Sequence, residues 1–317
     1  MAVPSFNSIG GVKMYAIMIV AGVIAAYFLA SYEAKKKGFA RDTITDVFLL
    51  ALPIGLIGAR IYFVLFHFDL YANDFLSVFK IWEGGLAIYG GVIAGAAAIY
   101  FYARHKKLSF FALCDILVSG VILAQAFGRW GNYFNIEAYG LTITDAAFQF
   151  FPLAVYVPSL AEWHMATFFY ESAWNVLGFI LLFFVIRKKG KTGDSMLWYF
   201  LWYGAGRMVI EGFRLDSLYL FSTGIRVSQL LSLLLVIAML VILVYKRASI
   251  KKALSAVIFA ALSLAVSSLC LFWQSSMVLS LGADSIRACL IPSSVLAGAL
   301  LLTGFIIYFY PRSEAVK

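Results

Sequence analysis

The stretch LSFFALCDILVSGVILAQAFGRWGNYFNIEAYG, residues 108–140, joins a long apolar run to a markedly polar end. The run 108–127 contains a single charged residue, Asp115. A transmembrane helix needs ~20 predominantly apolar residues, and this run is of that length. The stretch therefore predicts a membrane-spanning helix that finishes in an arginine, two asparagines and a glutamate.

The rest of the chain has the composition of a membrane protein. Of its 317 residues, 63% are hydrophobic and 13% are charged, against roughly 45–50% and about 25% in soluble domains. The net charge of +9 comes from short basic clusters between apolar runs, so it does not indicate a nucleic-acid partner. The three cysteines lie in or beside apolar segments without metal-ligand spacing.

Nine apolar segments are candidate membrane spans. They cover roughly residues 14–31, 46–66, 86–103, 109–127, 166–186, 195–213, 227–245, 253–273 and 289–310. Lysines and arginines cluster after the first, third, fifth and seventh of them, and the positive-inside rule makes that side cytoplasmic and the N-terminus outer. We therefore predict an all-α, polytopic integral membrane protein, with a seven-span body at 1–247 and an extra two-helix hairpin and tail at 248–317.

Two segments predicted to lie near the outer surface carry unusual sequences. The connection 130–165 has no lysine or arginine and is strongly apolar, so we expect it to lie on the outer membrane surface as a short helix or flap. His164 ends this connection and is more typical of an interface residue than of a base, whereas Glu171 is a buried carboxylate that needs a partner. The glycines of WEGGLAIYGGVIAG, residues 82–95, favour close helix packing and a local helix break. Tyr89 would then project toward a cavity, although an aromatic residue at this level could equally belong to the interfacial belt.

Arginines are the most informative polar residues. Five of them lie inside or at the outer end of apolar spans, namely Arg60, Arg129, Arg207, Arg214 and Arg226. An arginine at membrane depth costs at least ~2.5–3.5 kcal/mol on insertion scales and usually faces a protein interior or a polar cavity. Its planar guanidinium group matches two oxygens of a phosphate. Together they predict a basic cavity that opens to the outer leaflet and binds a phosphate.

Structural roles remain open for individual members of this set. Arg207 and Glu211 have i, i+4 spacing and could neutralise each other. Arg214 and Asp216 could form an ordinary pair at the outer interface, and Arg60 could extend to the outer headgroups.

Two blocks of the sequence resemble a known family. GRWGNYFNIEAYG, residues 128–140, resembles the signature GRxGNFxNxExxG of the prolipoprotein diacylglyceryl transferase family, with Tyr133 in place of Phe. GAGRMVIEGFRLDSL, residues 204–218, resembles the family's RxxxExxRxD block.

Two further blocks extend the resemblance over residues 14–245. IWEGGLAIYGGVIAG resembles the glycine-rich third span of the family. HMATFFYES is similar to the family's HPTxLYES, with Met165 and Ala166 in place of Pro and Thr. The tail after residue 250 lies beyond the resemblance.

The resemblance implies an enzyme, a diacylglyceryl transferase. It would move the diacylglyceryl group of phosphatidylglycerol onto the lipobox cysteine thiol of a prolipoprotein signal peptide, and glycerol-1-phosphate would leave. Both substrates would meet in the bacterial plasma membrane, at a multi-pass protein whose active site faces the outer leaflet. No metal, nucleotide or other cofactor is implied.

The resemblance and the arginine pattern together predict the site residues. The catalytic candidates are Arg129, Arg207 and Tyr89. The substrate-binding candidates are Tyr15, Arg60, Asn132, Asn135, Glu137, Gly140, Glu211, Arg214 and Gln229.

Tyr89 stands where many family members carry a histidine proposed to activate the thiol. A tyrosine has an ordinary pKa of ~10 and is rarely ionised at neutral pH. One alternative is that another residue acts as the base. We favour the hypothesis that the reaction needs no dedicated base, because a cysteine thiol of pKa ~8.5 can ionise beside several arginines.

Functions of other classes remain alternatives. The first is a transporter or flippase for an anionic lipid or metabolite, and the second is a lipid-binding membrane scaffold. A carrier would need polar residues in the cytoplasmic half of the membrane, where Asp115 is the clear candidate.

Overall fold

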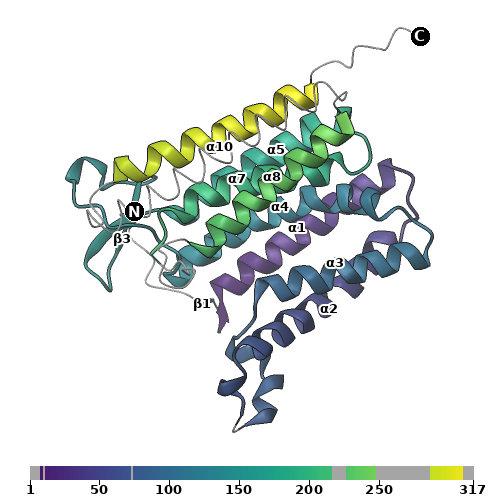
Figure 1. Ribbon diagram of the computed structural model, residues 1–317. Helices are drawn as coiled ribbons and strands as arrows, with labels where there is room; N and C mark the ends of the chain where they lie inside the picture. Colours follow the sequence, from purple (N-terminus) through teal and green to yellow (C-terminus); the bar gives the residue numbers. More distant parts are fainter. Residues whose placement is uncertain (1–7, 10, 73, 216–225, 248–285, 310–317) are drawn as a thin grey trace. The chain divides into compact units, whose positions relative to one another are not determined.

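The computed structural model describes residues 8–9, 11–72, 74–215, 226–247 and 286–309. This part of the chain is mostly helical (Figure 1). Five of its helices are long and apolar enough to cross a membrane. They are α1 (Met14–Lys36), α2 (Thr43–Phe66), α4 (Phe110–Asn135), α5 (Thr167–Ile180) with its continuation, and α8 (Val227–Arg247). The prediction of a helical, multi-pass membrane protein is confirmed.

Four predicted spans are not among these five helices. Two of them are the shorter helices α3 (Ile88–His105) and α7 (Asp194–Glu211). The predicted span 253–273 lies outside the described residues, and 289–310 corresponds to helix α10 (Ile286–Phe309). The counts of seven body spans and two hairpin helices therefore stay predictions.

The chain divides into two compact units. The first comprises the described residues of 1–23, 121–190 and 194–317. The second comprises residues 24–120 and 191–193. The boundaries fall within α1 and α4. The predicted domain division at residue 247 stays a prediction, because residues 248–285 lie outside the described part.

Glycines hold α2 against α3 in the second unit. A Cβ atom added to Gly58 would lie 2.2 Å from the Ala94 Cβ, and one added to Gly90 would lie 2.3 Å from the Gly58 carbonyl oxygen. The expectation of close packing in the third span is thus confirmed. Before α3, Gly84 and Gly85 have φ angles of 93° and 72°, so the predicted helix break lies at this pair.

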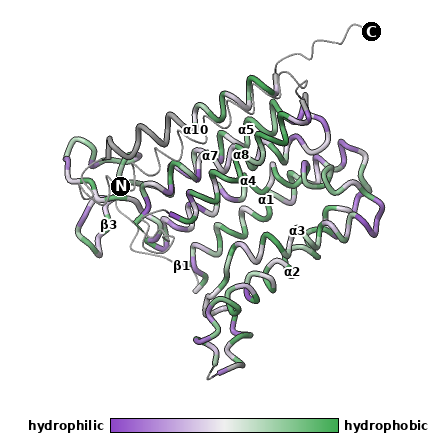
Figure 2. Tube along the Cα trace, viewed as in Figure 1, coloured by the Kyte–Doolittle hydropathy of each residue, from purple (hydrophilic) through white to green (hydrophobic). Residues whose placement is uncertain are grey.

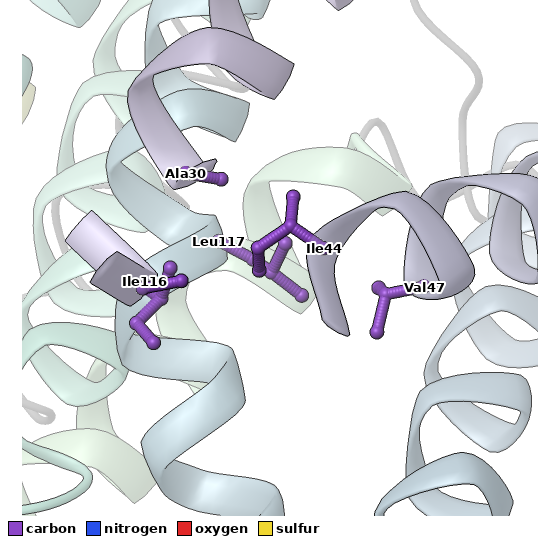
Figure 3. Close-up of a cluster of buried hydrophobic side chains, with 6 residues drawn as sticks. Ala30, Ile44, Val47, Ile116 and Leu117 are labelled. Atoms are coloured by element: carbon purple, nitrogen blue, oxygen red, sulfur yellow. The ribbon is translucent and has the colours of Figure 1, made fainter. Parts of the chain in front are cut away.

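A second contact region of this unit joins α1, α2 and the start of α4. Ala30, Ile44, Val47, Ile116 and Leu117 are buried together there (Figure 3). Partly buried aromatic residues, among them Tyr27 and Phe48, pack against this cluster, and such apolar contacts stabilise a helical core.

In the first unit, α4, α5, α7, α8 and α10 run alongside one another (Figure 1). Polar contacts, in addition to apolar contacts, join α4 to α5 and α7. The Ser172 hydroxyl donates to the Ala126 carbonyl at 3.0 Å, and the Gln125 side chain donates to the Tyr199 hydroxyl at 2.9 Å. Figure 2 shows hydrophobic residues along the middles of these helices and hydrophilic residues toward their ends.

The continuation of α5 is not α-helical. Residues Leu181–Ile186 form the π-helical segment η5, which leads into the short helix α6 (Arg187–Lys189). Leu182 and Ile186 of this segment are fully buried. A π turn accommodates one residue more than an α turn.

The connection 130–165 differs from the all-α prediction. It holds the 3₁₀ helix η4 (Ala146–Phe148) and the strands β3 (Ala154–Val157) and β4 (Glu162–Met165), which pair antiparallel. A second small hairpin, β1 (Ser8–Ile9) with β2 (Val12–Lys13), precedes α1. The β-branched AVYV run before a proline-containing turn favours an extended strand over a surface helix.

Candidate functional site

The asparagine amides of the stretch 128–140 close the end of α4. The Glu137 carboxylate accepts hydrogen bonds from Asn132 Nδ2 at 2.8 Å and from Asn135 Nδ2 at 3.3 Å. The Glu137 backbone N–H donates to the Asn132 carbonyl at 3.1 Å. A carboxylate beside a helix C-terminus faces the negative end of the helix dipole. The two amide donors offset this repulsion, so the three predicted residues form one turn.

This turn stores backbone strain. Ile136 and Ala138, on either side of Glu137, both have a φ of 57°. That left-handed conformation is unfavourable for residues other than glycine, most of all for a β-branched one. The hydrogen bonds to Glu137 and the bond from the Thr167 hydroxyl to the Ala138 carbonyl hold the turn in place.

Gly140 brings three segments together. Its N–H donates to the Met165 carbonyl at 2.9 Å, and it forms a β-bridge with Arg214. A Cβ at this position would come within 2.8 Å of Met165 and Thr167 side-chain atoms and 3.0 Å from the Phe213 carbonyl oxygen. Gly140, the last residue of the stretch 128–140, is therefore a close-approach position that ties the end of α4 to the residues before Arg214.

Three arginines converge on the buried carboxylate of Glu171, the fifth residue of α5. Arg129 pairs with Oε2, and Arg207 Nη1 lies 2.6 Å from Oε1. Arg214 Nη1 lies 3.7 Å from the same Oε1. The expectation that Glu171 needs a partner is confirmed, with three partners instead of one.

Glu211, at the end of α7, is the second shared carboxylate. Arg207 Nη2 lies 2.5 Å from its Oε2, and Arg214 Nε lies 3.9 Å from it. Arg226 donates to the Glu211 backbone carbonyl. The i, i+4 pairing of Arg207 with Glu211 is present, but Arg207 bridges both carboxylates, so the two residues do not simply neutralise each other.

Within the described residues, the cluster holds more guanidinium groups than carboxylates. Arg129, Arg207 and Arg214 contact the carboxylates of Glu171 and Glu211, and Arg226 contacts the Glu211 backbone; Asp216, the predicted partner of Arg214, lies outside the described residues. The carboxylates are the buried component, with side chains 6% exposed for Glu171 and 2% for Glu211. The arginine side chains retain more exposure, at 20% for Arg129, 17% for Arg207 and 13% for Arg214. Each guanidinium has five N–H donors in a planar fork, the geometry that matches the oxygens of a phosphate.

Two other predicted site residues pack within the first unit. The Tyr15 ring lies against the backbone of Gly131, where an added Cβ would come within 2.8 Å of the ring. Gln229, on α8, is buried and donates to the Met208 carbonyl at 3.0 Å. Gln229 therefore holds α8 against α7 immediately beside Arg207.

Arg60 and Tyr89 belong to the second unit. The Arg60 guanidinium donates to the carbonyls of Val78 at 2.7 Å, Gly84 at 2.6 Å and Ser77 at 2.7 Å. Arg60 thereby organises the connection that precedes α3. Tyr89 lies in the first turn of α3 and is 47% exposed.

His164 has a structural environment. Its ring is 2% exposed, its Nδ1 lies 2.9 Å from the Gly140 carbonyl oxygen, and its Nε2 lies 3.3 Å from Glu162 Oε2. The Nδ1 contact holds β4 against the segment at Gly140, whereas Glu162 lies on β4 itself.

Tyr203 is a site residue that sequence reasoning missed. It lies one turn before Arg207 on α7 and interacts with the Arg129 guanidinium. The i, i+4 spacing from Arg207 was the available signal. Within the described residues, no group of three or more His, Cys, Asp or Glu side chains could hold a metal ion.

Comparisons with known proteins show which family this chain belongs to. A family model described as prolipoprotein diacylglyceryl transferase matches residues 4–245. A phosphatidylglycerol–prolipoprotein diacylglyceryl transferase of Enterococcus faecalis is 45% identical over 243 residues, which are 74% of this chain and 87% of the relative. A Streptococcus pneumoniae protein of the same name is 43% identical over 240 residues, covering 74% of this chain and 90% of the relative. The match to the family over most of the chain, including the arginine cluster, shows that this chain belongs to the prolipoprotein diacylglyceryl transferase family.

Proposed function

We propose that this protein transfers the diacylglyceryl group of phosphatidylglycerol to the lipobox cysteine of a prolipoprotein signal peptide. The observation that carries the proposal is the cluster of Arg129, Arg207 and Arg214 around Glu171, in a chain whose relatives bear this activity in their names. Phosphatidylglycerol is an anionic phosphodiester, and guanidinium groups match its oxygens.

The reaction is a substitution at carbon. The cysteine thiolate attacks the glyceryl carbon that bears the phosphate oxygen, a C–S bond forms, and the C–O bond to the phosphate breaks. Glycerol-1-phosphate leaves with the electron pair, so negative charge accumulates on its oxygen. Arg129 and Arg207 are held in place by Glu171 before substrate binds, and such preorganised donors stabilise developing charge with little reorganisation.

The thiol reaches its ionised form without a dedicated base. A thiol of ordinary pKa ~8.5 is more acidic beside cations. The guanidinium groups of the cluster supply them, and the thiol proton passes to water, because a phosphate monoester with a second pKa of ~6 is mostly the dianion at neutral pH. Tyr89, at the position where many family members carry histidine, is therefore not needed as a base in this proposal.

The proposal includes a topology. Seven spans form the body at 1–247, and 248–317 form a C-terminal hairpin and tail. The N-terminus and the arginine cluster face the outer leaflet of the bacterial plasma membrane, where a signal peptide arrives from the side. The basic clusters after the odd-numbered spans support this orientation.

The test incubates the purified protein with labelled phosphatidylglycerol and a peptide that contains a lipobox cysteine. We expect a thioether product that is lost in Arg129→Ala and Arg207→Ala. Arg104→Ala is the matched control, because Arg104 is an exposed arginine in the last turn of α3. Absence of product with the wild-type protein, together with movement of labelled lipid between leaflets, would support a transporter or flippase instead.

A further inference from the structure

Two tryptophans join α5 and α7 in a reciprocal contact. The Trp174 indole N–H donates to the Trp202 carbonyl at 3.0 Å, and the Trp202 indole N–H donates to the Trp174 carbonyl at 2.9 Å. The two rings are stacked, with centroids 4.3 Å apart and planes inclined by 16°. Each helix thus supplies both a donor and an acceptor to the other.

A glycine on each helix makes room for the opposite indole. A Cβ at Gly206 would lie 2.1 Å from Trp174 Nε1, and a Cβ at Gly178 would lie 2.5 Å from Trp202 Nε1. In both helices the glycine follows the tryptophan by four residues, so it lies on the same face one turn later. We call these four residues the tryptophan latch.

The latch restricts how α5 and α7 can move against each other. Both indole N–H groups lie in an apolar part of the chain, where a donor without an acceptor is costly. Sliding or rotation of one helix would break both hydrogen bonds and drive both rings into the opposite backbone. The two reciprocal hydrogen bonds together therefore fix the axial position of α5 relative to α7 more strictly than one of them alone would.

The site lies next to the latch. Glu171 precedes Trp174 by three residues on α5, which is about 4.5 Å along a helix axis. Arg207 directly follows Gly206 on α7. The 2.6 Å contact between Arg207 Nη1 and Glu171 Oε1 joins the same two helices, so any shift between them changes this contact directly.

We propose that Trp174, Gly178, Trp202 and Gly206 are positioning residues that hold Glu171 in register with Arg207. The inference rests on the proposed function, because it assigns the latch to the placement of the arginine that stabilises the leaving phosphate. Positional errors of about 1 Å in such groups can cost a hundredfold in rate.

The experiment measures kcat/KM for transfer to the lipobox peptide in Trp174→Phe, Trp202→Phe and Gly206→Ala. The phenylalanine variants keep an aromatic ring and remove the N–H donor. Gly298→Ala is the matched control for Gly206→Ala, because a Cβ at Gly298 meets nothing within 4 Å. We expect about a tenfold or greater loss in the three latch variants, equivalent to about 1.4 kcal/mol of transition-state stabilisation, and wild-type activity in the control. Assays use protein that elutes as the wild type does on size exclusion.

A double-mutant cycle separates positioning from general destabilisation. If Trp174 acts through the Glu171–Arg207 contact, Trp174→Phe costs much less in a Glu171→Gln background than in the wild type. Glu171→Asp replaces Glu171→Gln if the latter forms no measurable product. Equal losses in both backgrounds, or full activity of all three latch variants, would overturn the inference. Lack of transfer by the wild-type protein would instead overturn the proposed function.

Discussion

Glu171 is the residue on which the charges of the site depend, because Arg129, Arg207 and Arg214 all approach its carboxylate. Its side chain is only 6% exposed. A buried ion pair can be replaced as a whole by apolar groups of similar volume at little cost, but removal of one member leaves uncompensated charge. This single anion offsets the mutual repulsion of the three guanidinium groups.

Glu171→Gln is therefore expected to destabilise the fold as well as the site. The amide keeps the shape of the carboxylate and removes its charge, and loss of a buried partner typically costs about 3–5 kcal/mol. The measurement is thermal unfolding in detergent. Asp74→Asn is the control, because Asp74 is 55% exposed in its pair with Lys80, and such surface pairs contribute about 0–1 kcal/mol. Equal melting temperatures for wild type and Glu171→Gln would contradict the shared-anion account.

Arg207 illustrates why the type of cation matters. It contacts Glu171 through Nη1 and Glu211 through Nη2. A lysine has one ammonium group and cannot reproduce the planar fork. We expect Arg207→Lys to lower kcat/KM at least tenfold in the lipobox-peptide assay, whereas Arg104→Lys retains activity. A fully active Arg207→Lys would show that charge alone suffices at this position.

At the site, the sequence alone predicts which types of residue are present better than it predicts which residues contact one another. Arginines at membrane depth are rare and costly, so their clustering was visible in the sequence, as was the need of Glu171 for a partner. The role of Tyr203 was hidden, because tyrosines are common at membrane interfaces. The carbonyl ligands of Arg60 were also hidden, since they depend on the fold of the residues before α3.

At the scale of elements, the helices were predictable and the connections less so. Long apolar runs of α1, α2, α4, α5 and α8 admit one structure in a membrane. The β3–β4 hairpin depends instead on packing of Val155, Val157 and Ala166 with aromatic residues of the first unit. That packing involves neighbours distant in the sequence, which a local pattern does not contain.

Helix α10 lies beyond the family match, yet it covers a face of α7. The Phe305 and Tyr308 rings lie 4.7 Å and 5.5 Å from the Trp198 ring, and Trp198 is 1% exposed. We expect Phe305→Ala to lower stability by about 1–3 kcal/mol, since it opens a space beside a buried indole. Leu302→Ala on the same helix is the control, because Leu302 is 60% exposed. If both variants unfold at the wild-type temperature, α10 does not stabilise α7.

At the scale of the whole molecule, the sequence predicts an orientation in the membrane. Basic clusters follow alternate apolar segments, and the positive-inside rule assigns them to the cytoplasm. This inference uses charge distribution alone and does not require knowledge of how the two compact units are arranged.

Single-cysteine labelling checks this orientation. In a variant with the three native cysteines replaced, we expect Thr144→Cys to react with a membrane-impermeant maleimide in intact cells. Lys37→Cys should react only after the membrane is permeabilised. Both positions are exposed, so access to the reagent depends on the side of the membrane. The reverse labelling pattern would refute the proposed topology.

The π-helical segment η5 has a consequence for which residues of this helix face its surroundings. Gly178, Leu182 and Ile186 are buried, while Leu177 and Phe184 are 53% and 50% exposed. A π turn holds more residues than an α turn, so nitroxide spin labels placed one at a time along residues 179–186 should show oxygen collision rates that repeat every four residues or more through η5. A repeat of 3.6 residues throughout would mean that the helix winds regularly in the bilayer.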